Sequence, residues 1–87
     1  MIDIIQTRVY VENEVTYSLK NGWTLCLQKC KYIHGNGDVE EGYRFIWKDP
    51  DGKLQAHRGQ ARIPSLAIAQ KLIEEAIKAG WGNEEFD

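Results

Sequence analysis

The amino-acid sequence predicts an α+β fold, in which an antiparallel sheet of four to five strands carries one C-terminal amphipathic helix packed on one face. Three observations predict this class. Short runs rich in β-branched and aromatic residues alternate between apolar and polar positions. The dipeptide Asn21-Gly22 separates two of these runs, which is the strongest short signal for a β-hairpin. A helical repeat of apolar residues begins after Pro64, and it needs a sheet surface to pack against.

Three strands and a loop are expected in the first half of the chain. The strands cover residues 2–11, 15–19 and 23–33. The third strand has no cleanly apolar face, so we expect a β-bulge near Gln28-Lys29 that carries it from one environment to another. Residues 35–42 contain three glycines and three acids. That composition is typical of a surface loop.

Two further strands are expected on either side of a tight turn. Residues 43–48 alternate between aromatic and basic or apolar side chains and form the fourth strand. The residues Asp49-Pro50-Asp51-Gly52 suit the successive positions of a type I turn closed by a glycine. The fifth strand covers residues 54–63, and its apolar phase changes at Gly59, where we expect a bulge.

The helix is expected to begin after Ser65, whose hydroxyl can accept a hydrogen bond from an orphan amide of the first turn. Its apolar residues recur at steps of three and four: Leu66, Ala69, Leu72, Ile73, Ala76 and Ile77. We expect Ile73 of the helix and Trp47 of the sheet to be buried in the same core.

The chain length and charge limit the class of protein. The 87 residues suffice for one domain, residues 1–87, with a frayed tail at residues 82–87. The net charge of −2 argues against a protein that coats nucleic acid non-specifically. The N-terminus lacks the features of a signal peptide, and no run approaches the roughly 20 apolar residues of a membrane helix. We therefore expect a cytoplasmic protein without a membrane partner, whose thiols stay reduced.

Cys26, Cys30 and His34 stand at an even spacing of four and raise the possibility of a metal site. Along a strand, residues four apart lie about 13 Å apart, whereas one metal ion holds its ligands at about 2.0–2.3 Å. Neither cysteine lies at a helix N-terminus that would activate it as a nucleophile. We interpret this stretch as a strand with structural thiols, and we predict no metal, cofactor or catalytic residue.

The middle of the chain is a basic island, since residues 42–62 carry five Lys and Arg against two Asp, a balance of +3. The candidate binding surface consists of Arg44, Lys48, His57, Arg58, Gln60 and Arg62. We expect it on the outer face of a β-ribbon at residues 43–63, which could enter a DNA major groove. The alternative is a solvated polar face, which every half-buried antiparallel sheet has.

The layout of a hairpin followed by a helix, from Tyr43 to Trp81, loosely resembles three-stranded-sheet DNA-binding domains. Examples are the plant AP2-type domains and the arm-binding domains of phage integrases. The resemblance covers under half of the chain and rests on layout alone. A shared fold would not establish a shared function.

Three functions follow, in order of preference. The first is a small cytoplasmic, non-catalytic binding module with a protein as its partner. The second is a nucleic-acid-binding protein that uses the basic β-ribbon. The third is an enzyme, which we rank last because no convergent acid, base and nucleophile can be picked out. The sequence predicts no particular oligomeric state.

Overall fold

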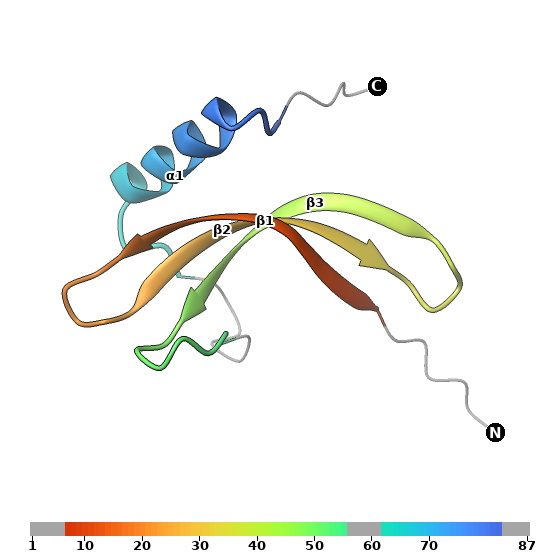
Figure 1. Ribbon diagram of the computed structural model, residues 1–87, viewed down its shortest axis with the longest axis horizontal. Coiled ribbons are helices and arrows are strands. Elements are labelled where there is room, and N and C mark those ends of the chain that lie inside the picture. Colours follow the sequence, from red (N-terminus) through yellow and green to blue (C-terminus); the bar gives the residue numbers. More distant parts are fainter. Residues whose placement is uncertain (1–6, 56–61, 83–87) are drawn as a thin grey trace.

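The computed structural model describes residues 7–55 and 62–82, which form a three-stranded antiparallel sheet and one helix (Figure 1). In chain order the elements are β1 (Arg8–Ser18), β2 (Thr24–Ile33), β3 (Val39–Lys48) and α1 (Leu66–Lys78). β2 lies in the centre of the sheet, between β1 and β3. The predicted α+β class is confirmed. The described residues hold three strands, however, instead of the four to five predicted.

β1 is one long strand where the sequence predicts two, at residues 2–11 and 15–19. Residues 1–6 lie outside the described residues, and pairing with β2 continues from Arg8 to Ser18 through the polar stretch between the two predicted strands. The prediction of two separate strands is wrong. β2 provides backbone hydrogen-bond partners for the polar stretch, and this pairing does not depend on the side chains.

A β-bulge in β1 explains why the side-chain pattern indicates two strands. The register shifts between Val11 and Asn13, which pairs with Lys29, so Glu12 is an extra residue. One extra residue reverses the alternation of side chains, so the valines before the bulge point to one face and the apolar residues after it to the other. The sequence predicts a bulge at this level of the sheet, near Gln28-Lys29, but in the wrong strand.

The predicted loop at residues 35–42 is shorter in the structure, because β3 already begins at Val39. His34 donates its backbone N–H to the carbonyl of Asp38, and Gly37 donates to the carbonyl of His34. This tight turn brings the acidic residues after it into register with β2. Backbone pairing therefore extends the hairpin over residues whose side chains do not favour a strand.

The turn predicted at residues 49–52 is present. The backbone N–H of Gly52 donates to the carbonyl of Asp49 at 2.8 Å, and Gly52 has a φ of 84°. Beyond it, a fifth strand over residues 54–63 is not seen in the described residues, where only Leu54 pairs, through an isolated bridge to Lys48. Gly59 and its predicted bulge lie outside the described residues.

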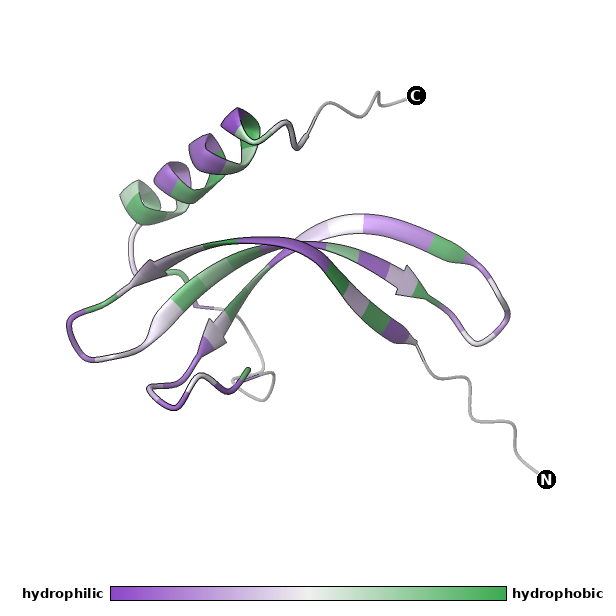
Figure 2. Cartoon of the chain, in the orientation of Figure 1, coloured by the Kyte–Doolittle hydropathy of each residue, from purple (hydrophilic) through white to green (hydrophobic). Residues whose placement is uncertain are grey.

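α1 begins as predicted, since the hydroxyl of Ser65 accepts a hydrogen bond from the backbone N–H of Ile68 at 3.2 Å. The helix packs over β1 and β2 on one side of the sheet, which we call the helix face. The helix face carries Val15, Tyr17, Leu25, Leu27, Phe45 and Trp47. The opposite face carries Glu14, Cys26, Gln28, Cys30, Arg44, Ile46 and Lys48. Figure 2 shows the apolar side of the helix turned toward the sheet.

Leu72 is completely buried in this core, and Trp47 is 7% exposed. The prediction that Ile73 shares the core is wrong, because Ile73 is 43% exposed. The apolar stripe of α1 is wider than the surface that β1 and β2 offer it. Ile73 and Ile77 therefore lie beside the core, on the side of the helix that faces β3.

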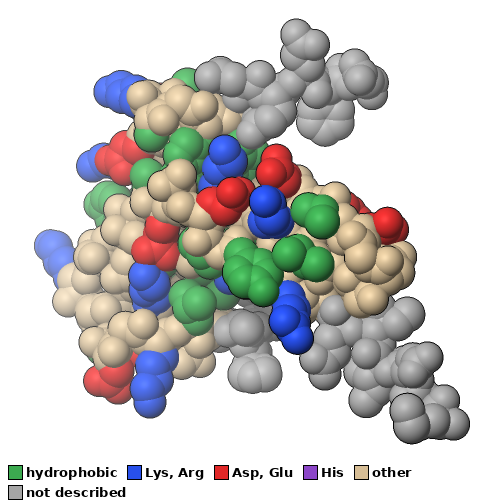
Figure 3. Space-filling view, turned by 45° about the vertical axis from the view of Figure 1, so that its right-hand side comes forward, with side chains coloured by type: hydrophobic (Ala, Val, Ile, Leu, Met, Phe, Trp, Pro, Cys, Tyr) green, Lys and Arg blue, Asp and Glu red, His purple; other side chains and the backbone are tan. Residues whose placement is uncertain are grey.

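The helix covers only part of the sheet. Its 13 residues span about 20 Å, whereas a strand of ten or eleven residues spans about 33–37 Å. We call the part beneath the helix the covered half and the remainder the distal half. The covered half contains residues 14–18, 24–28 and 44–48, and the distal half contains residues 8–13, 29–33 and 39–43. Figure 3 turns the distal half toward the viewer and shows hydrophobic side chains at the surface among charged ones.

Candidate functional site

An apolar groove lies on the helix face, between α1 and the surface of β3. It arises because the helix packs mainly over β1 and β2. Phe45 and Trp47 of β3 still join the core, but Tyr43 of β3 remains 41% exposed on that side. Its volume is about 330 Å³. The groove is lined by Leu27, Tyr43 and Phe45 from the sheet and by Ile73, Ala76, Ile77, Trp81 and Gly82 from the helix and the turn that follows it.

Two aromatic rings fix one wall of the groove. Gly80 has a φ of 93°, which reverses the chain after α1, and the backbone N–H of Trp81 then donates to the carbonyl of Ala76 at 3.0 Å. The ring of Trp81 stacks on that of Tyr43, with centroids 6.1 Å apart. The Tyr43 hydroxyl accepts a hydrogen bond from the backbone N–H of Gly82 at 2.9 Å. The end of the helix is thereby attached to β3.

The lining of the groove suits apolar side chains. Within the described residues no charged side chain lines it, and Tyr43, Ile73 and Ile77 expose 41%, 43% and 59% of their surface. Ligand pockets for small molecules span roughly 300–1,000 Å³ and combine apolar walls with a few convergent polar groups. This groove is at the lower end in size and lacks such polar groups. It therefore fits a few apolar side chains better than a polar metabolite.

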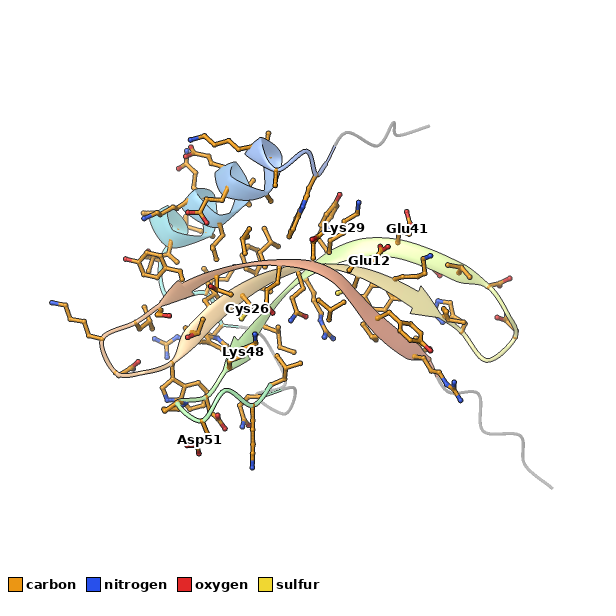
Figure 4. The ribbon with its side chains drawn as sticks, viewed as in Figure 1. Glu12, Cys26, Lys29, Glu41, Lys48 and Asp51 are labelled. Atoms are coloured by element: carbon orange, nitrogen blue, oxygen red, sulfur yellow. The ribbon has the colours of Figure 1, made fainter. Side chains whose placement is uncertain are left out.

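A hydrogen-bonded network crosses all three strands on the opposite face. Glu14 of β1 accepts from the Lys48 ammonium at 2.6 Å and, with its other carboxylate oxygen, from the Gln28 amide at 2.6 Å. The Gln28 amide oxygen accepts from Nε of Arg44 at 2.8 Å. Gln28 is 1% exposed, so its amide needs these partners. In Figure 4, Cys26 and Lys48 lie on the side of the sheet away from α1.

The network shifts the ionisation of its members. Burial would raise the pKa of Glu14, but the hydrogen bonds from Lys48 and Gln28, with the charge of Lys48, outweigh it and lower that pKa. The hydrogen bond to Glu14 raises the pKa of Lys48. Burial, with the nearby charge of Glu14, raises the pKa of Cys26 to about 11. The Cys26 thiol therefore stays protonated at neutral pH and is a poor nucleophile.

The structure places three of the six residues predicted as a binding surface. Arg44 and Lys48 lie on the opposite face and are engaged by Gln28 and Glu14. Arg62 is exposed, and its backbone carbonyl accepts from the indole N–H of Trp47 at 2.8 Å. His57, Arg58 and Gln60 lie outside the described residues. Arg62 also lines a smaller hollow of about 170 Å³ with Leu19, Asn21, Trp23, Trp47 and Pro64.

The interpretation of the cysteine stretch as a strand is confirmed. Cys26 and Cys30 both belong to β2, and both are buried free thiols. Within residues 7–55 and 62–82, no three or more His, Cys, Asp and Glu side chains gather closely enough to hold a metal ion. The one helix among those residues is too short to cross a membrane.

The groove is not among the predicted sites, although the sequence carries one signal for it. Eight of the 13 residues of α1 are apolar, which is more than its buried side uses, since Leu66, Ile73 and Ile77 remain exposed. Comparisons with family models, with curated proteins and with solved structures found no match.

Proposed function

We propose that this protein is a non-catalytic binding module that holds an apolar segment of a partner protein in the groove between α1 and β3. One observation carries the proposal: apolar side chains from the helix and from the sheet line a groove and remain exposed. Exposed apolar surface of this kind marks interaction sites on soluble domains. Leaving these apolar side chains exposed to water does not stabilise the fold.

The proposed occupant is an amphipathic helix of the partner, held by its apolar stripe. A helix laid next to α1 would cover the exposed part of β3, and its apolar residues at steps of three and four would enter the groove. Among residues 63–82, two Lys balance two Glu, so the charge beside the groove favours neither sign in the partner.

Nucleic-acid binding through the basic β-ribbon is the second candidate of the sequence. The pairing of Lys48 with Glu14 and the hydrogen bond from Arg44 to Gln28 weigh against it. Phosphate contacts would have to replace these bonds and would leave Glu14 close to a polyanion. We therefore favour the protein-binding function.

The proposal is tested by capturing partners from an extract of the native host, with and without nuclease treatment, with three forms of the protein. The wild type and Leu66→Gln should capture the same protein, because Leu66 is 84% exposed and does not line the groove. The double variant Ile73→Gln/Ile77→Gln should lose it. Glutamine keeps the charge unchanged and is a good helix former, so α1 should remain intact.

Two results would overturn the proposal. One is a partner that the double groove variant retains as well as Leu66→Gln does, since binding would then use another surface. The other is capture that disappears on nuclease treatment in all three forms, which would favour the nucleic-acid alternative. Circular dichroism of each variant confirms that the fold is intact.

A further inference from the structure

The outer edge of β1 offers an unpaired strand. β1 is an edge strand of the sheet, and within the described residues nothing pairs with its outer side. Its first six residues are all exposed, and Val9, Tyr10 and Val11 expose 38%, 50% and 43% of their surface. Natural proteins usually block such an edge with charged side chains, proline, a β-bulge or a covering segment. In β1 the bulge comes only at Glu12, and the stretch from Arg8 to Val11 contains no lysine or proline.

This edge is complementary to itself. Suppose that a second copy runs antiparallel alongside this edge, with the two-fold axis through Tyr10. Residues whose numbers add up to 20 then lie opposite each other. Arg8 then faces Glu12 of the second copy, Val9 faces Val11, and Tyr10 faces Tyr10. Within the described residues neither Arg8 nor Glu12 takes part in an ion pair. We propose that two copies of the chain pair through residues 8–12 of β1, which joins their sheets into one of six strands.

The faces of the sheet agree with this pairing. Arg8 and Tyr10 lie on the helix face, because they pair with Ile33 and Lys31. Glu12 points to the same face, as Figure 4 shows. On that face the dimer would thus have a Tyr10 pair flanked by two Arg8–Glu12 ion pairs. Val9 and Val11 lie on the opposite face, so four valines would meet there.

The bulge limits the strength of this association. Glu12 is the extra residue of β1, so regular pairing of the outer edge ends there. Five paired residues per copy bury less surface than a stable dimer needs, so the dimer is a weak one that depends on concentration. The inference does not depend on the proposed function, because the groove lies over β3 at the other edge of the sheet.

Sedimentation equilibrium from about 10 µM to about 1 mM protein tests the association. Arg8→Glu replaces two attractive pairs by two repulsive ones, and the dissociation constant should rise about tenfold or more. Glu12→Arg should act in the same direction. The charge swap Arg8→Glu/Glu12→Arg should restore the wild-type constant. Lys20→Glu, an exposed change outside the paired stretch, is the control for net charge and should leave the constant unchanged.

Cross-linking tests the register. Two cysteines at position 10 would face each other about 5 Å apart. Two at position 13 would be about 20 Å apart along the strands. Tyr10→Cys should therefore oxidise to a disulfide-linked dimer and Asn13→Cys should not, while Cys26 and Cys30 stay buried in both. A chain that is monomeric at every concentration, a dimer that the charge swap does not restore, or equal cross-linking of the two variants would overturn the proposal.

Discussion

The two halves of the sheet share one backbone ladder but are held in different ways. In the covered half, Leu25, Cys26, Leu27 and Gln28 are buried in succession, because α1 packs on one face of β2 and the polar network lies on the other. In the distal half, all six residues of β1 and four of the five residues of β3 are exposed, and on β2 only Cys30 is buried. Hydrophobic burial therefore stabilises the covered half. The distal half depends mainly on backbone pairing and on exposed side-chain contacts such as that between His34 and Glu40.

The comparison shows how one small helix can hold a long sheet. A lone two-stranded hairpin is only marginally stable in water, whereas three strands with one buried face can fold. The covered half meets that condition. The distal half extends from it as a continuous ladder, which leaves an edge and an apolar surface available for partners. Our two proposals use the surface that this arrangement leaves exposed: the groove lies beside α1, and the free edge of β1 lies in the distal half.

The largest loss of stability is expected when the contact between the helix and the covered half is removed. Leu72→Ala should reduce the free energy of unfolding by about 2–5 kcal/mol, since the side chain is completely buried. Ile73→Ala, one residue along the same helix, should cost less than about 1 kcal/mol because half-exposed side chains lose little burial. Urea denaturation followed by circular dichroism measures both. Equal losses would mean that Ile73 belongs to the core after all.

The two hairpin turns give the second test, because each half of the sheet ends in one. Gly22 and Gly37 have nearly the same φ, 92° and 93°. A Cβ at Gly22 would approach Pro50 to 3.3 Å, whereas a Cβ at Gly37 would meet nothing within 4 Å. Gly22→Ala should therefore cost about 1–3 kcal/mol, from backbone strain and that contact. Gly37→Ala should cost less, since only the strain remains. The same denaturation experiment compares them, and a larger cost at Gly37 would refute this account.

The sequence predicts the covered half better than the distal half. The cap at Ser65, the turn ending at Gly52 and the helix position follow from local chemistry, so each can be predicted from a few residues. The extension of β3 back to Val39 depends on hydrogen bonds to β2, which no local pattern reveals. The bulge at Glu12 has the same cause, since its register is set by the neighbouring strand.

The candidate site is harder to predict, because its position depends on which part of the sheet surface the helix leaves exposed. Arg44 and Lys48 stand out in the sequence as basic residues, but their partners, Gln28 and Glu14, lie 16 and 34 positions away. Only the fold brings them together. The surplus of apolar residues on α1 indicates that some of them lie outside the core, but a helical repeat does not show which, because it does not reveal the width of the surface beneath it.

The third test concerns the ion pair of the covered half. Glu14→Gln removes a charged acceptor from Lys48 and from the buried amide of Gln28, so it should cost about 1–2 kcal/mol at pH 7. The folded-state pKa of Glu14 is lowered, so its contribution is present at neutral pH and is lost as the pH falls through that lowered pKa. Urea denaturation of both proteins at pH 7 and near pH 3 should therefore show a difference that shrinks in acid. A difference independent of pH would mean that the carboxylate charge is not responsible.

The smallest effect is expected from the matching pair of the distal half. His34 and Glu40 lie 3.0 Å apart at the turn between β2 and β3, but the Glu40 side chain is 74% exposed, against 24% for Glu14. An exposed ion pair is weakened by solvent and by the entropy of holding two side chains, so Glu40→Gln should change the free energy of unfolding by less than about 0.5 kcal/mol. His34 also keeps its hydrogen bond to the hydroxyl of Thr7 at 3.0 Å, which limits the loss further. The measurement is urea denaturation at pH 7, with Glu14→Gln prepared in parallel as the comparison. A loss at Glu40 as large as that at Glu14 would show that the distal half depends on its side chains as strongly as the covered half does.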